Sequence, residues 1–232
     1  MPAPGTVKLG RMDSRPKLAE EVTENIRQAI LKGMYQDGDK LVLEEVATDL
    51  GVSIMPVREA IITLTNEGLV AAEPRRGFRV VPLKQEDLDD VFEVQARLAG
   101  ILAGRAARVA TADDIAQLRA LQARLEQLAR SSSTRAHKQL GQVNGEFHRF
   151  INKLPQGDRV RWFLRLTTKF VRQDLFESVP GVLQSALNDH PRIIDAMERG
   201  DAEQAQSLME THFLQGAHLF GCTQLVESAD ST

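Results

Sequence analysis

Apolar residues recur at helical spacing along most of this chain of 232 residues, but the pattern changes near residue 83. Before that point, short helical stripes end in two stretches of strand character, Leu69–Glu73 and Gly77–Pro82. Beyond it, only helical periodicity is found. The pattern predicts a mainly α protein, with a mixed N-terminal unit over residues 1–82 and an all-α helical bundle over residues 83–232.

Short helices with glycine breaks are expected in the first unit. They cover Leu18–Gly33, Leu43–Leu50 and residues 53 to about 67, and Ser53 is a residue type that caps a helix. At about 100° per residue, four apolar residues share one face of the last helix: Val57, Ala60, Ile61 and Leu64. The outer arc carries Met55, Arg58, Glu59, Ile62 and Asn66. This helix is therefore expected to pack by one face and to present the other to a partner.

Two short helices around Gly51-Val52-Ser53, followed by a hairpin, are typical of a winged helix-turn-helix. In this motif the second helix enters the major groove of DNA. Arg58 can bind a guanine edge or a phosphate there, and Met55 can contact a thymine methyl group. Ser53 and the first-turn amides can hold a phosphate.

Charge is distributed unevenly along the chain. The net charge of −3 argues weakly against a nucleic-acid partner. Basic residues nevertheless cluster at Lys8, Arg11, Arg15 and Lys17, and again at Arg75, Arg76 and Arg79. At the tip of the hairpin, Arg75 and Arg76 can reach the DNA backbone or the minor groove, and Gly77 allows close approach.

Four stretches of the first unit match a known family in sequence and spacing: Gly38–Leu41, Leu50–Ala60, Glu67–Val70 and Arg76–Val80. Over residues 16 to 82 the chain resembles the GntR-type winged helix-turn-helix. The resemblance implies operator binding through the residues matching Ser53, Met55, Arg58 and Gly77.

The reading surface departs from that family at three positions. Ile54 and Ile62 stand where many relatives carry arginine, and Glu44 stands where some have a DNA-contacting arginine. Because these changes remove positive charge, the affinity for DNA is expected to depend on Arg58, on the wing and on the N-terminal arm. The wing is the hairpin that carries Arg75 and Arg76, and the arm is the basic stretch before the first helix.

Six helices are predicted in the second unit: about Glu86–Ala110, Ala112–Arg130, Arg135–Leu154, Asp158–Ser178, Val182–Arg199 and Asp201–Leu225. Its motifs are Asn144-x-x-x-His148, Asp189-His190 before Ile193-Ile194, Gly200-Asp201, and His212. Over about residues 86–219 these motifs resemble the FCD domain, the all-α ligand-sensing domain of the FadR-like subfamily of GntR regulators.

Four side chains of this unit form a candidate metal site. Asn144 and His148 lie one helical turn apart and share a face. His190 and His212 flank the Gly200-Asp201 turn at similar distances, so an antiparallel helix pair brings them nearly level. Three imidazoles and one oxygen suit a borderline divalent ion, with zinc and nickel favoured. The FCD resemblance implies the same four ligands.

The oxygen ligand departs from the family pattern, in which this position is usually aspartate. A neutral Asn144 holds the ion less tightly and favours an anionic ligand that completes the coordination. His137 and His218 are not expected to bind the metal, since His218 lies about 240° around its helix from His212.

Arginines near the metal are candidates for binding an effector. Arg161, Arg165, Thr168 and Arg172 share one side of a predicted helix, and a turn at residues 155–157 folds Arg165 back level with His148. Arg165 and Arg172 are candidates to bind a small carboxylate, whereas Arg161 is expected to be solvated. FCD relatives often supply an arginine from their first helix, where this chain has Gln95, with Arg97 nearby.

Three classes of function are compatible with a DNA-binding motif next to a candidate metal site. The favoured class is a transcriptional regulator that binds a near-palindromic operator as a homodimer and acts as a repressor released by the carboxylate. An enzyme needs an acid or base beside the metal, but Glu146 and Asp189 are expected to point away from it. A purely structural metal is disfavoured because such sites are usually closed.

Composition bears on the cellular location and on cysteine chemistry. The single cysteine, Cys222, excludes an internal disulfide and a cysteine-based zinc site. The first 17 residues lack the apolar segment of a signal peptide, and no run is apolar enough to span a bilayer. A cytoplasmic protein without membrane contact is expected.

Overall fold

The chain divides into two compact units between residues 82 and 83. The computed structural model describes residues 17–229, except residues 82, 132, 173, 175–177 and 180. The basic residues Lys8, Arg11 and Arg15 of the predicted N-terminal arm lie outside the described residues.

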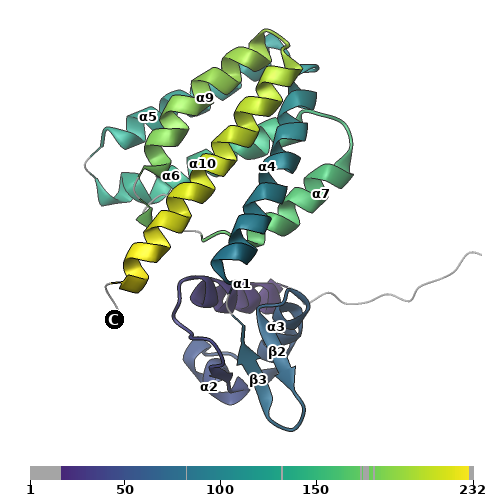
Figure 1. Ribbon diagram of the computed structural model, residues 1–232, viewed down its shortest axis with the longest axis vertical. Helices are drawn as coiled ribbons and strands as arrows, with labels where there is room; N and C mark the ends of the chain where they lie inside the picture. The colour runs from purple at the N-terminus through teal and green to yellow at the C-terminus, as the bar shows by residue number, and fades with distance from the viewer. Residues whose placement is uncertain are drawn as a thin grey trace, which may run out of the picture. The chain divides into compact units, whose positions relative to one another are not determined.

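The first unit has the predicted helix-turn-helix and hairpin (Figure 1). Its elements are α1 (Lys17–Leu31), β1 (Lys40–Leu41), α2 (Leu43–Leu50), α3 (Ile54–Asn66), β2 (Val70–Glu73) and β3 (Gly77–Val80). Both α1 and α2 pack against α3. Gly51, in the left-handed conformation with φ 65°, ends α2 and allows the tight turn into α3.

The core of this unit follows the predicted faces. On α3, Val57, Ala60, Ile61 and Leu64 are completely buried, and on α1 the stripe of Val22, Ile26 and Ile30 is buried as well. Met55 and Ile62 on the other arc of α3 are 62% and 53% exposed. Burial of one face thus fixes α3 in the unit and leaves the opposite face accessible.

The sheet is antiparallel with strand order β1-β3-β2. The hairpin pairs Val70 with Val80 and Glu73 with Gly77, so its tip is formed by residues 74–76. The strand β1 was not predicted. It has only two residues after the Asp37-Gly38 turn, too few for an alternating pattern, and it forms by pairing with β3.

The second unit is helical throughout its described part. Its elements are α4 (Gln85–Ala107), α5 (Ala112–Ala129), α6 (Thr134–Lys153), α7 (Asp158–Thr167), the 3₁₀ turn η1 (Thr168–Phe170), α9 (Val182–Glu198) and α10 (Ala202–Ala229). The helix α10 packs along α4 and beside α9, and α5 packs against α6 and α9 (Figure 1). Leu102, Leu118, Phe147, Ile151 and Ile193 lie at the centre of the core.

Two glycines allow α4 and α10 to approach closely. A Cβ on Gly104 would lie 2.8 Å from the main-chain oxygen of Ala202, and a Cβ on Gly100 would clash with the Glu210 side chain. The absence of a side chain at these positions brings the two backbones together, and α10 is thereby held where its histidine can face α6 and α9.

The helix predicted over Asp158–Ser178 is wrong in its second half, because α7 ends at Thr167. The hydroxyls of Thr167 and Thr168 donate to the carbonyls of Leu164 and Arg165, three residues back, at 2.7 and 3.0 Å. Such local bonds favour a tightened 3₁₀ turn, and Val171 beyond it is extended. Arg172 therefore does not continue the helical face of Arg165.

Candidate functional site

The exposed arc of α3 is the candidate DNA-reading surface. Arg58 and Met55 are exposed on it, beside Ile54 and Ile62. Ser53 begins the helix in extended conformation, and its hydroxyl makes no capping hydrogen bond. That hydroxyl and the first-turn amides therefore keep their capacity to bind a phosphate.

The wing carries its charge at the tip. Arg75 and Arg76 are exposed there, with Arg75 in the left-handed region at φ 65°, and Gly77 follows at φ 95°. Arg79 has a different role, because its Nε lies 2.7 Å from Glu73 and its guanidinium donates to the carbonyl of Gly38. Arg79 therefore ties the wing to the turn before β1 and contributes little to the charge of the tip.

A buried ion pair behind α3 was missed by the sequence analysis. Arg27 of α1 is 3% exposed and donates to both carboxylate oxygens of Glu67 at 2.9 and 3.0 Å. Glu67 is the C-cap residue of α3, so this bidentate bond fixes the end of the reading helix against α1. The signal in the sequence is an arginine next to Ile26 in the apolar stripe of α1.

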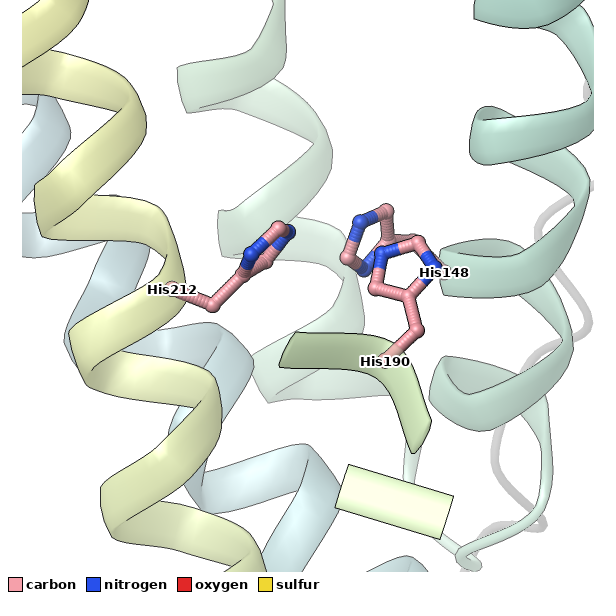
Figure 2. A group of neighbouring side chains, drawn as sticks. All are labelled: His148, His190 and His212. Atoms are coloured by element: carbon pink, nitrogen blue, oxygen red, sulfur yellow. The ribbon is translucent and has the colours of Figure 1, made fainter. Parts of the chain in front are cut away.

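Three histidines from three helices converge in the second unit. His148 of α6, His190 of α9 and His212 of α10 point toward one another, and one nitrogen from each lies within 4.8 Å of the others (Figure 2). The ring centroids are 5.0 to 5.3 Å apart. His137 and His218 are not part of this group.

The outer nitrogens of two rings are held by hydrogen bonds. His190 Nδ1 lies 3.1 Å from Gln122 Oε1, and the amide nitrogen of Gln122 donates to Glu126, which turns the amide oxygen toward the ring. His212 Nδ1 lies 3.2 Å from Asp189 Oδ2. Because both partners are acceptors, Nδ1 of each ring is the donor, and in the neutral form of each ring the lone pair is then on Nε2.

Two buried acceptors of this group have no partner within the described part of the chain: His190 Nε2 and Asn144 Oδ1. Buried polar atoms are rarely left without a hydrogen bond, so such a pair calls for an explanation. A divalent ion among the three imidazoles and the amide oxygen would satisfy both atoms, and nitrogen and oxygen donors of this kind suit zinc or nickel.

The electrostatics of the site favour the neutral form of His148 and His190 and the ionised form of Asp189. Burial, together with the neighbouring histidines, lowers the pKa of His190 well below its usual value, and burial lowers that of His148 as well. The hydrogen bond from His212 lowers the pKa of Asp189, and a bond from Ser185 adds to this. Metal ligation needs neutral imidazoles, which these shifts supply.

Asp189 and Gln122 are the supporting residues that the sequence analysis did not assign. Asp189 was expected to point away from the metal, but the fold brings its carboxylate to within 3.2 Å of Nδ1 of His212, which is one of the predicted ligands. Gln122 has a sequence signal, since it interrupts the buried stripe of Ile115, Leu118 and Leu125 on α5.

A cavity of about 700 Å³ opens beside the histidines. His148, His212 and Asn144 line it, as do the three candidate effector contacts, Gln95, Arg165 and Arg172. Gln95 is almost completely buried at 2% exposure. Arg97, by contrast, is exposed and pairs with Glu210 at 2.9 Å, away from the cavity lining.

The expectation that Arg161 is solvated holds only in part. Arg161 lines the cavity, pairs with Asp158 and donates to the main-chain oxygen of Asn152. The hydrogen bond to Asn152 spans the turn at residues 155–157 between α6 and α7, and the Arg161 side chain remains 31% exposed.

Comparison with known proteins is consistent with this two-unit fold. Residues 18–80 match the bacterial regulatory proteins of the gntR family, and residues 90–215 match the FCD domain. The transcriptional regulator YdhC of Bacillus subtilis is 22% identical over 191 residues, which cover 81% of this chain and 84% of that protein.

Two further relatives extend over most of the chain. A probable D-xylose utilization operon transcriptional repressor of Paenarthrobacter nicotinovorans is 27% identical over 200 residues, covering 86% of this chain and 87% of that protein. The structure of Escherichia coli McbR/YncC is 22% identical with a TM-score of 0.62, covering 92% of this chain and all of the other. The similarity to the McbR/YncC structure shows that the two chains share a fold.

These matches define the class: DNA-binding transcriptional regulators, not enzymes. The chain belongs to the GntR family of bacterial regulatory proteins, among the members that carry an FCD domain. Within the described residues, no helix combines the length and the apolar character needed to cross a membrane.

Proposed function

We propose that this regulator is a metal-dependent repressor that a small carboxylate releases from its operator. The first unit binds DNA as part of a homodimer in the cytoplasm, with Ser53, Met55, Arg58, Arg75, Arg76 and Gly77 at the interface. The second unit binds a divalent ion through Asn144, His148, His190 and His212. Gln95, Arg165 and Arg172 contact the effector.

The observation that carries this proposal is the cluster of three histidines, two of which, His148 and His212, line the wall of a cavity. Asn144 Oδ1 and His190 Nε2 are buried without partners, and a divalent ion fits both donors. Such an ion, when bound, supplies Lewis acidity for a carboxylate. Asp189 and Gln122 orient two of the imidazole rings, and Arg165 contributes a positive charge that attracts the carboxylate of the effector.

The cavity also distinguishes a sensor from a structural metal site. A structural zinc site is closed by protein ligands. Here His148 and His212 both line a cavity large enough for a small metabolite, so a ligand from solvent has access to the ligating side.

Metal content tests the site directly. We expect His148→Ala, His190→Ala and His212→Ala each to lose most bound metal, because each removes one of three strong donors. His137→Ala and His218→Ala are matched controls that should retain it. The measurement is metal per chain after loading the stripped protein with zinc or nickel. A wild-type protein that retains neither ion after loading contradicts the metal site.

Release from the operator is tested on a DNA sequence that is first selected by its binding to the protein. Selection from a random duplex pool should yield two inverted half-sites, as expected for a homodimer. A thermal-shift screen of small carboxylates on the metal-loaded protein then identifies ligands, and these should lower affinity for the selected DNA. Ligands that bind without changing DNA affinity would contradict the release mechanism.

A further inference from the structure

The geometry points to a second anion-binding site in the cavity, formed by Arg149 and Lys153, so that the effector is an acid with two separated anionic groups. One group is the carboxylate at the histidine end, and the other is a carboxylate or phosphate about five or six bonds away. This inference rests on the proposed function, because it takes the first carboxylate as given.

The lining of the cavity is strongly asymmetric in charge. The described residues that line it include no carboxylate. They include five cations, namely Arg149, Lys153, Arg161, Arg165 and Arg172. Two of them have acidic partners outside the lining, Asp158 for Arg161 and Asp174 for Arg172. Three of the five cations have no such partner among the residues that the structure describes, so one carboxylate on the effector leaves two of them uncompensated.

Arg149 and Lys153 form a pair of their own. They lie four residues apart on α6, so their side chains project from the same face of the helix. In the described part of the chain, neither forms an ion pair with a carboxylate. Like charges at this spacing destabilise a helix, and an anion between them removes that cost.

The helix is shaped to hold the guanidinium of Arg149 at the cavity wall. A Cβ on Gly145 would lie 2.8 Å from Nη1 of Arg149, so the arginine side chain lies back over the position that this glycine leaves open. Gly145 and Arg149 both line the cavity. The small residue and the cation thus form one continuous part of the cavity lining.

Helix geometry sets the length of the ligand. Lys153 follows His148 by five residues, which at a rise of about 1.5 Å per residue places it about 7.5 Å further along α6. Arg165 on α7 remains available to the carboxylate at the histidine end. A linear diacid of about six carbons spans this separation, and a cavity of about 700 Å³ accommodates it.

Matched acids test the second site. The zinc-loaded full chain is titrated calorimetrically with hexanoate, which has one carboxylate, and with adipate, which has one at each end of the same chain. The analogous six-carbon acid with a terminal phosphonate distinguishes phosphate from carboxylate as the second group. We expect both dianions to bind at least about tenfold more tightly than hexanoate, as for one additional charge-assisted hydrogen bond.

Variants assign the preference to the two residues. Arg149→Gln and Lys153→Gln should each reduce the preference for the dianions over hexanoate several-fold, while affinity for hexanoate stays near that of the wild type. Arg159→Gln and Lys138→Gln are controls with the same charge change on exposed residues of α7 and α6 outside the lining. They should leave the preference unchanged.

The outcomes separate this inference from the proposed function. Hexanoate and adipate of equal affinity would overturn the second site and leave a carboxylate sensor in place. An equal loss for all acids in Arg149→Gln and Lys153→Gln would also overturn it. Failure of every acid to bind would contradict the second site and the proposed sensor together.

Discussion

The negative charge nearest the histidines comes from Asp189, which does not belong to the proposed ligand set. Its carboxylate accepts hydrogen bonds from His212 at 3.2 Å and from Ser185 at 2.9 Å, and the bond from His212 is the main cause of its lowered pKa. The oxygen ligand itself, Asn144, is neutral. In the proposed site, negative charge therefore acts through the imidazole of His212 rather than through the oxygen ligand.

Asp189→Asn should lower affinity for zinc about ten- to a hundredfold, as expected for removal of a carboxylate that orients a ligating histidine. Asn144→Asp should raise affinity, and in the double variant it should restore what Asp189→Asn loses. Competition with a zinc-binding dye measures all three proteins. The control is Asp195→Asn, since Asp195 pairs with Arg119 rather than with a histidine. Unchanged zinc affinity in Asp189→Asn would contradict this role.

Asn144→Asp should also weaken binding of the effector. The added carboxylate reduces the Lewis acidity of the ion and repels an incoming acid. Calorimetry with metal-saturated wild type and variant compares the two affinities. If they are equal, the effector does not coordinate the metal, and Arg165, Arg172 and Gln95 hold its carboxylate.

The histidines could be predicted from the sequence, whereas their supporting residues could not. Spacing along one helix paired Asn144 with His148, spacing around one turn paired His190 with His212, and the FCD resemblance joined the two pairs into one site. Gln122 and Asp189 reach their partners across helix interfaces, and these contacts depend on how each helix is rotated in the bundle. Periodicity within one helix does not determine that rotation.

At the scale of whole elements, prediction succeeded where burial decides the structure and failed where particular hydrogen bonds do. The buried and exposed faces of α3 follow from its sequence alone, because one apolar stripe must be covered. The end of α7 depends on two threonine hydroxyls, and β1 depends on a pairing partner distant in sequence. Neither of the latter leaves a periodic signal.

Arg58→Ala should reduce affinity for the selected operator by about 1–3 kcal/mol and relax the base preference at one position. The reason is that Arg58 is exposed on the outer arc of α3, so the variant removes a contact without disturbing the buried face. Fluorescence anisotropy on the selected duplex and its single-base variants measures both effects. Near-wild-type affinity in a folded variant would exclude Arg58 from the interface.

The start of α5 carries a pH-dependent cap. Asp114 accepts hydrogen bonds from the backbone and the hydroxyl of Thr111 at 2.9 and 2.7 Å, and the bond from the backbone is the main cause of its lowered pKa. A carboxyl whose pKa is lower in the folded state adds stability above its unfolded pKa of about 3.9, and this stability is lost as pH falls through the folded value.

Asp114→Ala should therefore destabilise the second unit by about 0.5 kcal/mol or more at neutral pH and by less below pH of about 3.9. Denaturation followed by Trp162, the only tryptophan, reports on this unit. Asp113→Ala is the control, since it removes a first-turn carboxylate that lies outside the capping box. A loss that is the same at every pH would contradict the charged cap.

At the scale of the whole molecule, DNA affinity has two physically distinct sources. The arc of α3 presents large apolar side chains around one arginine, whereas the tip of the wing presents two exposed arginines. Apolar and bidentate contacts read bases, and charge on the tip binds phosphates irrespective of sequence. Sequence preference and salt dependence are thus expected to reside in different parts of the first unit.

Replacing Arg75 and Arg76 together by alanine should weaken binding to all DNA sequences and flatten its salt dependence. Each lost phosphate contact reduces the slope of log affinity against log salt by about 0.9. Titrations at several salt concentrations with specific and random duplexes measure this. An unchanged slope would show that the wing does not contact phosphate.

Because His148 and His212 belong both to the histidine cluster and to the cavity wall, the proposed metal and the proposed effector are expected to be thermodynamically linked. If the acid binds more tightly to the loaded protein, the metal must bind more tightly in the presence of the acid by the same factor. The regulator then works as a coincidence detector, and the concentration of acid that relieves repression varies with the metal supply of the cell. Protein purified in a chelating buffer is then expected to bind its effector only weakly.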